Sequence, residues 1–131
     1  MTKGTILVVD ADAAIRNLVQ LALSDEGYTV CLSRERVTLD HRQARQADLI
    51  LLDVPPAEAS GRAMADRLRA DPATARIPLV GFSTRADGVA LAARLRLDAL
   101  LAKPFDLDAL SALVACWVVE GRHRRPRAAL C

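Results

Sequence analysis

The chain has 131 residues, of which 52% are hydrophobic, 26% charged and 3% aromatic, with a formal net charge of +2. This is the length of one domain with a substantial core. No uncharged apolar run approaches the roughly 20 residues that a membrane-spanning helix needs, and the start, MTKGTILVVD, lacks the long apolar stretch of a signal peptide. We therefore expect a cytoplasmic protein with no membrane partner.

The cysteines and the low aromatic content exclude further classes of site. Cys31, Cys116 and Cys131 have no metal-ligand spacing, and we interpret them as reduced thiols. The few aromatic residues provide no stacking platform for single-stranded nucleic acid. The segment from residue 120 carries four arginines and one glutamate. We interpret residues 120–131 as a solvated basic tail, and we do not expect nucleic acid as a partner.

Hydrophobic patterning predicts strands that alternate with helices, as in a doubly wound α/β sheet. The expected strands are 6–9, 28–32, 49–52, 79–82 and 99–102, and the expected helices are 13–26, 36–46, 59–70, 87–96 and 107–119. Asp12 can cap the first helix, and Gly27 can end it. The strand 49–52 is apolar throughout, which favours burial on both faces of a parallel sheet.

Three helices have an apolar stripe that we expect to face the core. In the first helix the stripe is Ile15, Leu18, Val19 and Ala22; in the third it is Gly61, Met64, Ala65 and Leu68; in the last it is Leu107, Leu110, Val114 and either Trp117 or Val118. The second helix has the thinnest apolar cover, from Val37, Leu39 and Ala44.

Polar side chains follow four of the five expected strands. Asp10 and Asp12 come after the first strand and Asp53 after the third; Ser83 with Thr84 and then Lys103 come after the last two. Because the carboxyl ends of parallel strands meet at one edge of a sheet, we expect these side chains to converge. Crowded carboxylates need a cation, and oxygen ligands suit Mg²⁺. A lysine and a hydroxyl beside them can hold phosphoryl oxygens.

In these features the chain resembles the receiver domain of two-component response regulators, over about residues 5–117. The segments that carry the resemblance are ILVVDADAAIR, Gly27, DLILLD, RLRADPATARIP, Ser83 and AKPF. The resemblance implies a flavodoxin-like fold, a doubly wound five-stranded parallel sheet in the strand order 2-1-3-4-5 with five helices. It places the receiver domain in residues 1–119.

The resemblance also implies roles for single residues. Asp53 is the phospho-acceptor, and Asp10 belongs to an acidic Mg²⁺ pocket. Ser83 takes the position of the switch hydroxyl. Lys103, before a cis Pro104, is the lysine that contacts the phosphoryl group.

The Mg²⁺ pocket departs from the family pattern at one ligand. The second of two adjacent carboxylates, usually a direct ligand, is Ala11 here, and Asp12 is expected to cap the helix rather than bind metal. Mg²⁺ can still use Asp10, Asp53, the backbone carbonyl of Pro55 and water molecules. We expect weak binding, with the affinity reduced about 10- to 100-fold by the loss of one charged ligand.

A second departure lies at the switch position three residues before Lys103. The family often has an aromatic ring there that moves inward when the hydroxyl contacts phosphate, whereas this chain has Leu100. A leucine provides no ring for that movement, although active receivers also vary at this position.

Three functional classes are compatible with these residues. We expect a single-domain response regulator whose Asp53 takes a phosphoryl group from a histidine kinase or phosphotransfer protein, and which signals by binding a downstream protein. Such a chain is no enzyme beyond its own phosphorylation and dephosphorylation. The alternative is a degenerate receiver, a phosphorylation-independent interaction module. The third class is an α/β phosphatase of the haloacid-dehalogenase type, to which DADAA is similar in spacing, but the chain has no room for a cap domain.

Two helices are more apolar than a single buried stripe requires. These helices, 87–96 and 107–119, include the runs VALAARL and ALVACWVV. In the receiver fold they flank the last strand, so their surplus apolar faces can form one patch. We expect this patch to support a homodimer; the alternative is that alanine-rich helices only reflect composition.

Overall fold

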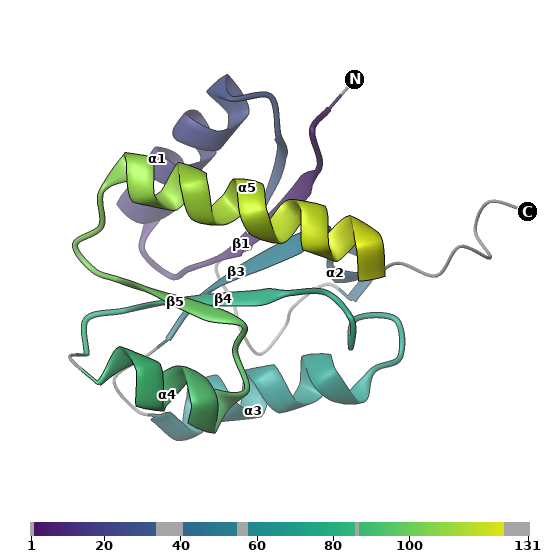
Figure 1. Ribbon diagram of the computed structural model, residues 1–131, viewed down its shortest axis with the longest axis vertical. Helices are drawn as coiled ribbons and strands as arrows, with labels where there is room; N and C mark the ends of the chain where they lie inside the picture. The colour runs from purple at the N-terminus through teal and green to yellow at the C-terminus, as the bar shows by residue number, and fades with distance from the viewer. Residues whose placement is uncertain (1, 34–40, 55–57, 86, 125–131) are drawn as a thin grey trace, which may run out of the picture.

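The computed structural model describes residues 2–33, 41–54, 58–85 and 87–124 (Figure 1). Its strands are β1 (Thr5–Val9), β2 (Thr29–Ser33), β3 (Leu49–Asp53), β4 (Leu79–Ser83) and β5 (Ala99–Ala102). Its helices are α1 (Ala13–Asp25), α2 (His41–Gln46), α3 (Glu58–Ala70), α4 (Gly88–Leu95) and α5 (Leu107–Arg124). Over these described ranges, no helix is both long and apolar enough to cross a bilayer.

The five strands form one parallel sheet in the order β2-β1-β3-β4-β5, which confirms the expected fold. Because side chains alternate along a strand, those of Ile6 and Val8 in β1 point to one face of the sheet, and those of Leu7 and Val9 point to the other. The first pair packs in the core beneath α1 and α5, and the second in the core beneath α2, α3 and α4. Figure 1 shows this layering, with α1 and α5 on one side of the sheet and α3 and α4 on the other.

The apolar patterns of β3 and α3 are buried as predicted. The four residues from Leu49 to Leu52 are fully buried, because helices cover both faces of the central strand. On α3 the expected stripe of Gly61, Met64, Ala65 and Leu68 is also buried. The predicted start of the second helix, with Val37 and Leu39, lies outside the described residues; Ala44 of α2 is buried.

The ends of α1 are confirmed, whereas its buried stripe is partly wrong. Asp12 is the N-cap and accepts a hydrogen bond from the backbone N–H of Ala14, and Gly27 follows the helix with φ of 103°. The buried residues are Val19 and Leu23, whereas Leu18 is 43% exposed. Residues next to each other on a helix point about 100° apart, and α1 packs on the sheet along a line narrower than the predicted stripe.

Helix α5 is longer than predicted, and it takes in the first part of the expected tail. It ends at Arg124 rather than at residue 119, and Gly121 is buried within it. Arg122 lies 3.7 Å from the carboxylate of Asp48, and Arg124 lies 3.3 Å from that of Asp98. Two largely buried aspartates thus fix a segment that composition alone suggested to be solvated; residues 125–131 lie outside the described residues.

The start of α5 also differs from the prediction. Leu107, expected to face inward, is 43% exposed, whereas Leu110, Val114 and Val118 are buried as predicted. Trp117, the alternative to Val118, is only half-buried, and its ring lies 5.6 Å from the guanidinium of Arg124. Leu107 is the first residue of the helix, and the first complete turn of contact with the sheet begins at Leu110.

Replacing Gly121 by alanine is expected to destabilise the protein. A methyl group there would overlap the carbonyl oxygen of Asp48 and approach Cδ of Pro78, and such overpacking costs about 1–3 kcal/mol. An exposed helical position would instead gain up to about 1 kcal/mol from the same change. Urea unfolding measures the difference. The control is Gly88→Ala, whose methyl group meets only the end of the Leu100 side chain; equal stability of the two variants would contradict the prediction.

Candidate functional site

The strand register places the predicted site residues along one edge of the sheet. Val9 lies opposite Leu52, Asp53 opposite Phe82, and Ser83 opposite Ala102. Each of these four strands ends at one of the paired residues, so the strand ends lie side by side. The carboxyl ends of β1, β3, β4 and β5 therefore present Asp10, Asp53, Ser83 and Lys103 at this edge, as the sequence predicts.

The centre of the site is an ammonium group that contacts two carboxylates. Nζ of Lys103 donates hydrogen bonds to Oδ1 of Asp53 at 2.8 Å and to Oδ2 of Asp10 at 3.2 Å. Asp10 is 2% exposed, whereas the side chains of Lys103 and Asp53 are 17% and 19% exposed. Asp53 is thus the carboxylate that a reactant can reach.

The charge state of Lys103 follows from two opposing effects. Burial alone would lower its pKa, but the hydrogen bond and charge of Asp53, together with those of Asp10, outweigh burial and raise the pKa above its usual value. The ammonium therefore persists at neutral pH and offsets the repulsion between the two carboxylates.

Hydrogen bonds to its side chain and to its backbone hold Asp10 in place. Its Oδ1 accepts a hydrogen bond from the N–H of Asp12 at 2.9 Å, and its own N–H donates to the carbonyl of Ser33 at 3.0 Å. Nη1 of Arg16 donates to the carbonyls of Asp10 and Ala11 at 2.8 and 3.0 Å. We did not predict this role for Arg16, although it lies one helical turn after Asp12, where a side chain can reach back to the loop.

Ser83 is buried, and its polar groups face the following loop. Its Oγ accepts a hydrogen bond from the backbone N–H of Arg85 at 3.0 Å, and its carbonyl accepts one from the N–H of Lys103 at 2.7 Å. Thr84 is exposed. The peptide bond between Lys103 and Pro104 is cis, as expected. The carbonyl of Ser83 thus contacts the backbone of Lys103, and its hydroxyl is bonded within the loop that follows β4.

The acidic groups of the site suit one hard cation. Asp10 and Asp53 bring two carboxylates within reach of a shared position, which is the ligand type that Mg²⁺ prefers. Within the described ranges no group of three or more His, Cys, Asp or Glu residues can hold a metal ion. Ala11 is exposed and contributes only its backbone, Asp12 is engaged as a cap, and Pro55 lies outside the described residues.

Two hollows adjoin this edge of the sheet. One, of about 310 Å³, is lined by Ile15, Leu18, Thr84, Lys103, Pro104 and Phe105. It places apolar surface of α1 directly beside Lys103, and it accounts for the exposure of Leu18. The other, of about 650 Å³, lies between α4 and β5 and includes the predicted switch position, Leu100, which is half-buried.

Comparison with known proteins gives one consistent family. A model of the response regulator receiver domain matches residues 6–115. The phosphate regulon transcriptional regulatory protein PhoB of Pseudomonas aeruginosa is 37% identical over 89 residues, which are 66% of this chain and 38% of PhoB. The chain therefore spans less than half the length of that relative.

Two solved structures have the same fold. The chemotaxis response regulator CheY4 of Vibrio cholerae is 23% identical, with a TM-score of 0.78 over 88% of this chain and 99% of CheY4. The receiver domain of a sensor histidine kinase of Pseudomonas aeruginosa is 22% identical, with a TM-score of 0.75 over 88% of this chain and 98% of that one. Its structure is described with a magnesium ion coordinated in the active site cleft.

Replacing Lys103 by methionine is expected to lower the free energy of unfolding at pH 7. The change leaves Asp10 buried without its ammonium partner, at a cost of about 1–3 kcal/mol, less than for a fully enclosed pair because water reaches Asp53. The raised pKa of Lys103 means that its stabilisation is complete below the unfolded value of about 10.4 and is lost as pH rises through the folded value.

Urea unfolding between pH 7 and pH 11 tests this dependence. The difference between the wild type and Lys103→Met should shrink toward the alkaline end. The matched control is Lys3→Met, since Lys3 is the other lysine of the chain and lies far from the site at the start of β1. A pH-independent difference for Lys103→Met would contradict the role of the ammonium.

Proposed function

The chain belongs to the response regulator receiver domain family, and from this membership we propose that it accepts a phosphoryl group on Asp53 and signals by binding another protein. Receiver domains are signalling modules that interact with histidine kinases and downstream effectors, so the phosphatase alternative has no support. The observation that carries the proposal is the contact of Lys103 with Asp53, at 2.8 Å, at the exposed edge of the sheet.

The proposed reaction follows from the placement of these groups. An oxygen of the Asp53 carboxylate forms a bond to phosphorus while the bond between phosphorus and the donor's histidine nitrogen breaks, and the electron pair leaves with the imidazole. Lys103 then contacts the transferred oxygens, as can the hydroxyl of Ser83. When bound by Asp10 and Asp53, Mg²⁺ supplies further charge neutralisation.

The hollow beside Lys103 supports a protein as phosphodonor. Leu18 is an exposed leucine at its rim, and Leu21, one turn further along α1, is 72% exposed. Apolar surface of this kind marks partner sites. A histidine kinase or phosphotransfer protein that packs on α1 would bring its phosphohistidine to Asp53. That the chain works as a single-domain regulator stays a prediction.

Phosphorylation of Asp53 can be tested by intact-mass analysis after incubation with acetyl phosphate and Mg²⁺. We expect a gain of one phosphoryl group, which is absent in the isosteric Asp53→Asn. Asp12→Asn is the matched control, because Asp12 is a carboxylate that caps α1 outside the reacting pair. No gain for the wild type would favour the degenerate receiver, in which the loss of the ligand at Ala11 has ended phosphorylation.

If alanine at position 11 makes the proposed Mg²⁺ site weak, one substitution there should strengthen Mg²⁺ binding. Ala11→Asp should raise the Mg²⁺ affinity about 10- to 100-fold, because it restores a charged oxygen ligand next to Asp10. NMR shifts of the amides around Asp53 during a Mg²⁺ titration measure the affinity, and Ala11→Asn separates the charge from the added bulk. Equal Mg²⁺ affinity of the wild type and Ala11→Asp would show that Ala11 is not the cause of weak Mg²⁺ binding.

We also propose self-association through α4, α5 and the outer strand β5. β5 is an edge strand, and Val89 of α4, which is 90% exposed, lines the hollow beside it. Val119 of α5 is 56% exposed and lines a separate hollow with Arg122 and His123. A two-fold contact would cover this surface and the 650 Å³ hollow. Sedimentation at micromolar concentrations should detect a dimer that Val89→Glu weakens. Leu21→Glu, on α1, is the control, and a monomer under all these conditions would refute the contact.

A further inference from the structure

The start of α4 contains an aspartate that does not cap the helix. Asp87 occupies the N-cap position, yet its side chain makes no capping hydrogen bond. Aspartate at this position ordinarily accepts an N–H from the first turn. Here its carboxylate accepts hydrogen bonds from Nε and Nη2 of Arg85 at 3.0 and 2.8 Å, and from Nη2 of Arg94 at 2.9 Å. We call Arg85, Asp87 and Arg94 the Asp87 clamp.

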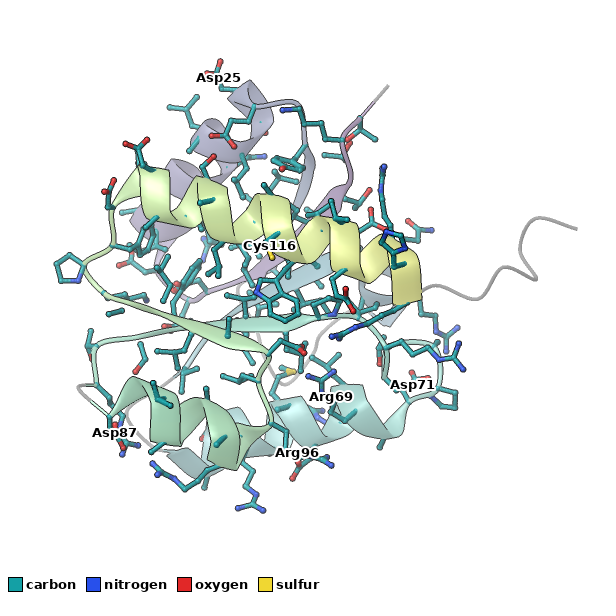
Figure 2. All side chains as sticks on the ribbon, viewed as in Figure 1. Asp25, Arg69, Asp71, Asp87, Arg96 and Cys116 are labelled. Carbon is teal, nitrogen blue, oxygen red and sulfur yellow. The ribbon has the colours of Figure 1, made fainter. Side chains whose placement is uncertain are left out.

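The Asp87 clamp is connected to the phosphorylation site through Ser83. The backbone N–H of Arg85 donates to Oγ of Ser83 at 3.0 Å, and the carbonyl of Ser83 accepts the N–H of Lys103. Hydrogen bonds and the covalent frames of Lys103, Ser83 and Arg85 thus connect the backbone of Lys103 to Asp87, whose carboxylate contacts Arg94 in the last turn of α4. Figure 2 shows Asp87 at the start of this helix and Arg96 beyond its other end.

Asp87 has two alternative sets of partners. Its carboxylate can bind the two guanidinium groups, as observed, or turn toward the amides of the first turn of α4, which have no acceptor within the helix. The same oxygens serve both purposes, so the two arrangements exclude each other. Exposed ion pairs and N-caps contribute similar, modest stabilisation, and a small change at either end can therefore shift the balance.

We propose that Asp87 is the conformational readout of this receiver, bound in the Asp87 clamp at rest and capping α4 when the site is phosphorylated. The trigger rests on the proposed function: a phosphoryl group on Asp53 attracts the hydroxyl of Ser83, which then loses its contact with the N–H of Arg85. Arg85 is released from its position, and the carboxylate of Asp87 turns to the helix. This readout needs no aromatic ring, which agrees with leucine at position 100.

Two further observations support the proposal. The hydrogen bond from Arg94, together with the contacts of Arg85, holds the pKa of Asp87 below its usual value, as expected for a carboxylate that two guanidinium groups attract. Arg85 also lines the hollow between α4 and β5, next to Gly88 and Val89. Opening of the clamp therefore changes the rim of a surface that a partner protein can contact.

The first experiment needs no phosphorylation. Asp87→Asn keeps the ability to cap and loses the ion pairs, whereas Asp87→Ala loses both. Hydrogen exchange of the Val89 and Ala90 amides should be about five-fold slower in Asp87→Asn than in Asp87→Ala. Ser83→Ala, which removes the acceptor for Arg85, should shift the NMR signals of these amides in the direction of Asp87→Asn. Asp66→Asn is the control, because its ion pair with Arg96 lies beyond the end of α4.

The second experiment adds acetyl phosphate and Mg²⁺ to the wild type. The amides of Val89 and Ala90 should move toward their positions in Asp87→Asn. Phosphorylation of Asp53 without movement of these amides would overturn the readout and leave the proposed function intact. Absence of phosphorylation, with Asp87→Asn and Ser83→Ala still shifting the amides together, would overturn the proposed function and support the coupling. Equal exchange in Asp87→Asn and Asp87→Ala would overturn the readout in either case.

Discussion

The ammonium group of Lys103, held between Asp10 and Asp53, is the contact on which the rest of the site depends. A parallel sheet brings the carboxyl ends of its strands to one edge, and in this chain two of those ends are acidic. Two carboxylates so close would raise the energy of the folded state unless a cation lay between them. Lys103, directly after β5, provides that cation at 2.8 Å from Asp53 and 3.2 Å from Asp10, and it connects the ends of three strands at this edge.

At the opposite edge of the sheet, where the strands begin, two aspartates also accept hydrogen bonds, and there they stabilise the fold. The carboxylate of Asp98 accepts hydrogen bonds from the N–H of Leu79 and from Arg69, and it pairs with Arg124. Asp48 accepts the N–H of Thr5. These carboxylates fix α5 and the strand starts through hydrogen bonds and ion pairs. At the edge with Lys103, by contrast, the side chain of Asp53 is 19% exposed, so aspartates support the fold at one end of the sheet and leave a carboxylate within reach of a reactant at the other.

Under the proposed function, the chain keeps the two groups that contact the phosphoryl group and departs from the family pattern in the groups around them. Asp53 and Lys103 are in contact, whereas alanine stands at position 11, where the resemblance implies a carboxylate, and leucine stands at position 100, where the family often has an aromatic ring. The first change acts on charge and the second on shape. Both leave the proposed phospho-acceptor, Asp53, unchanged, and the proposed readout by Asp87 gives the α4 surface another way to respond.

Much of this architecture was predictable from the sequence because it depends on local patterns. Apolar runs and their polar ends identified the five strands and the convergence of Asp10, Asp53, Ser83 and Lys103. The exposure of Leu18, the extension of α5 to Arg124 and the contacts of Arg16 and Asp87 were not predictable. Whether a leucine is covered, a helical turn is held or an aspartate caps its own helix depends on neighbours far away in the chain, and only tertiary packing brings those neighbours together.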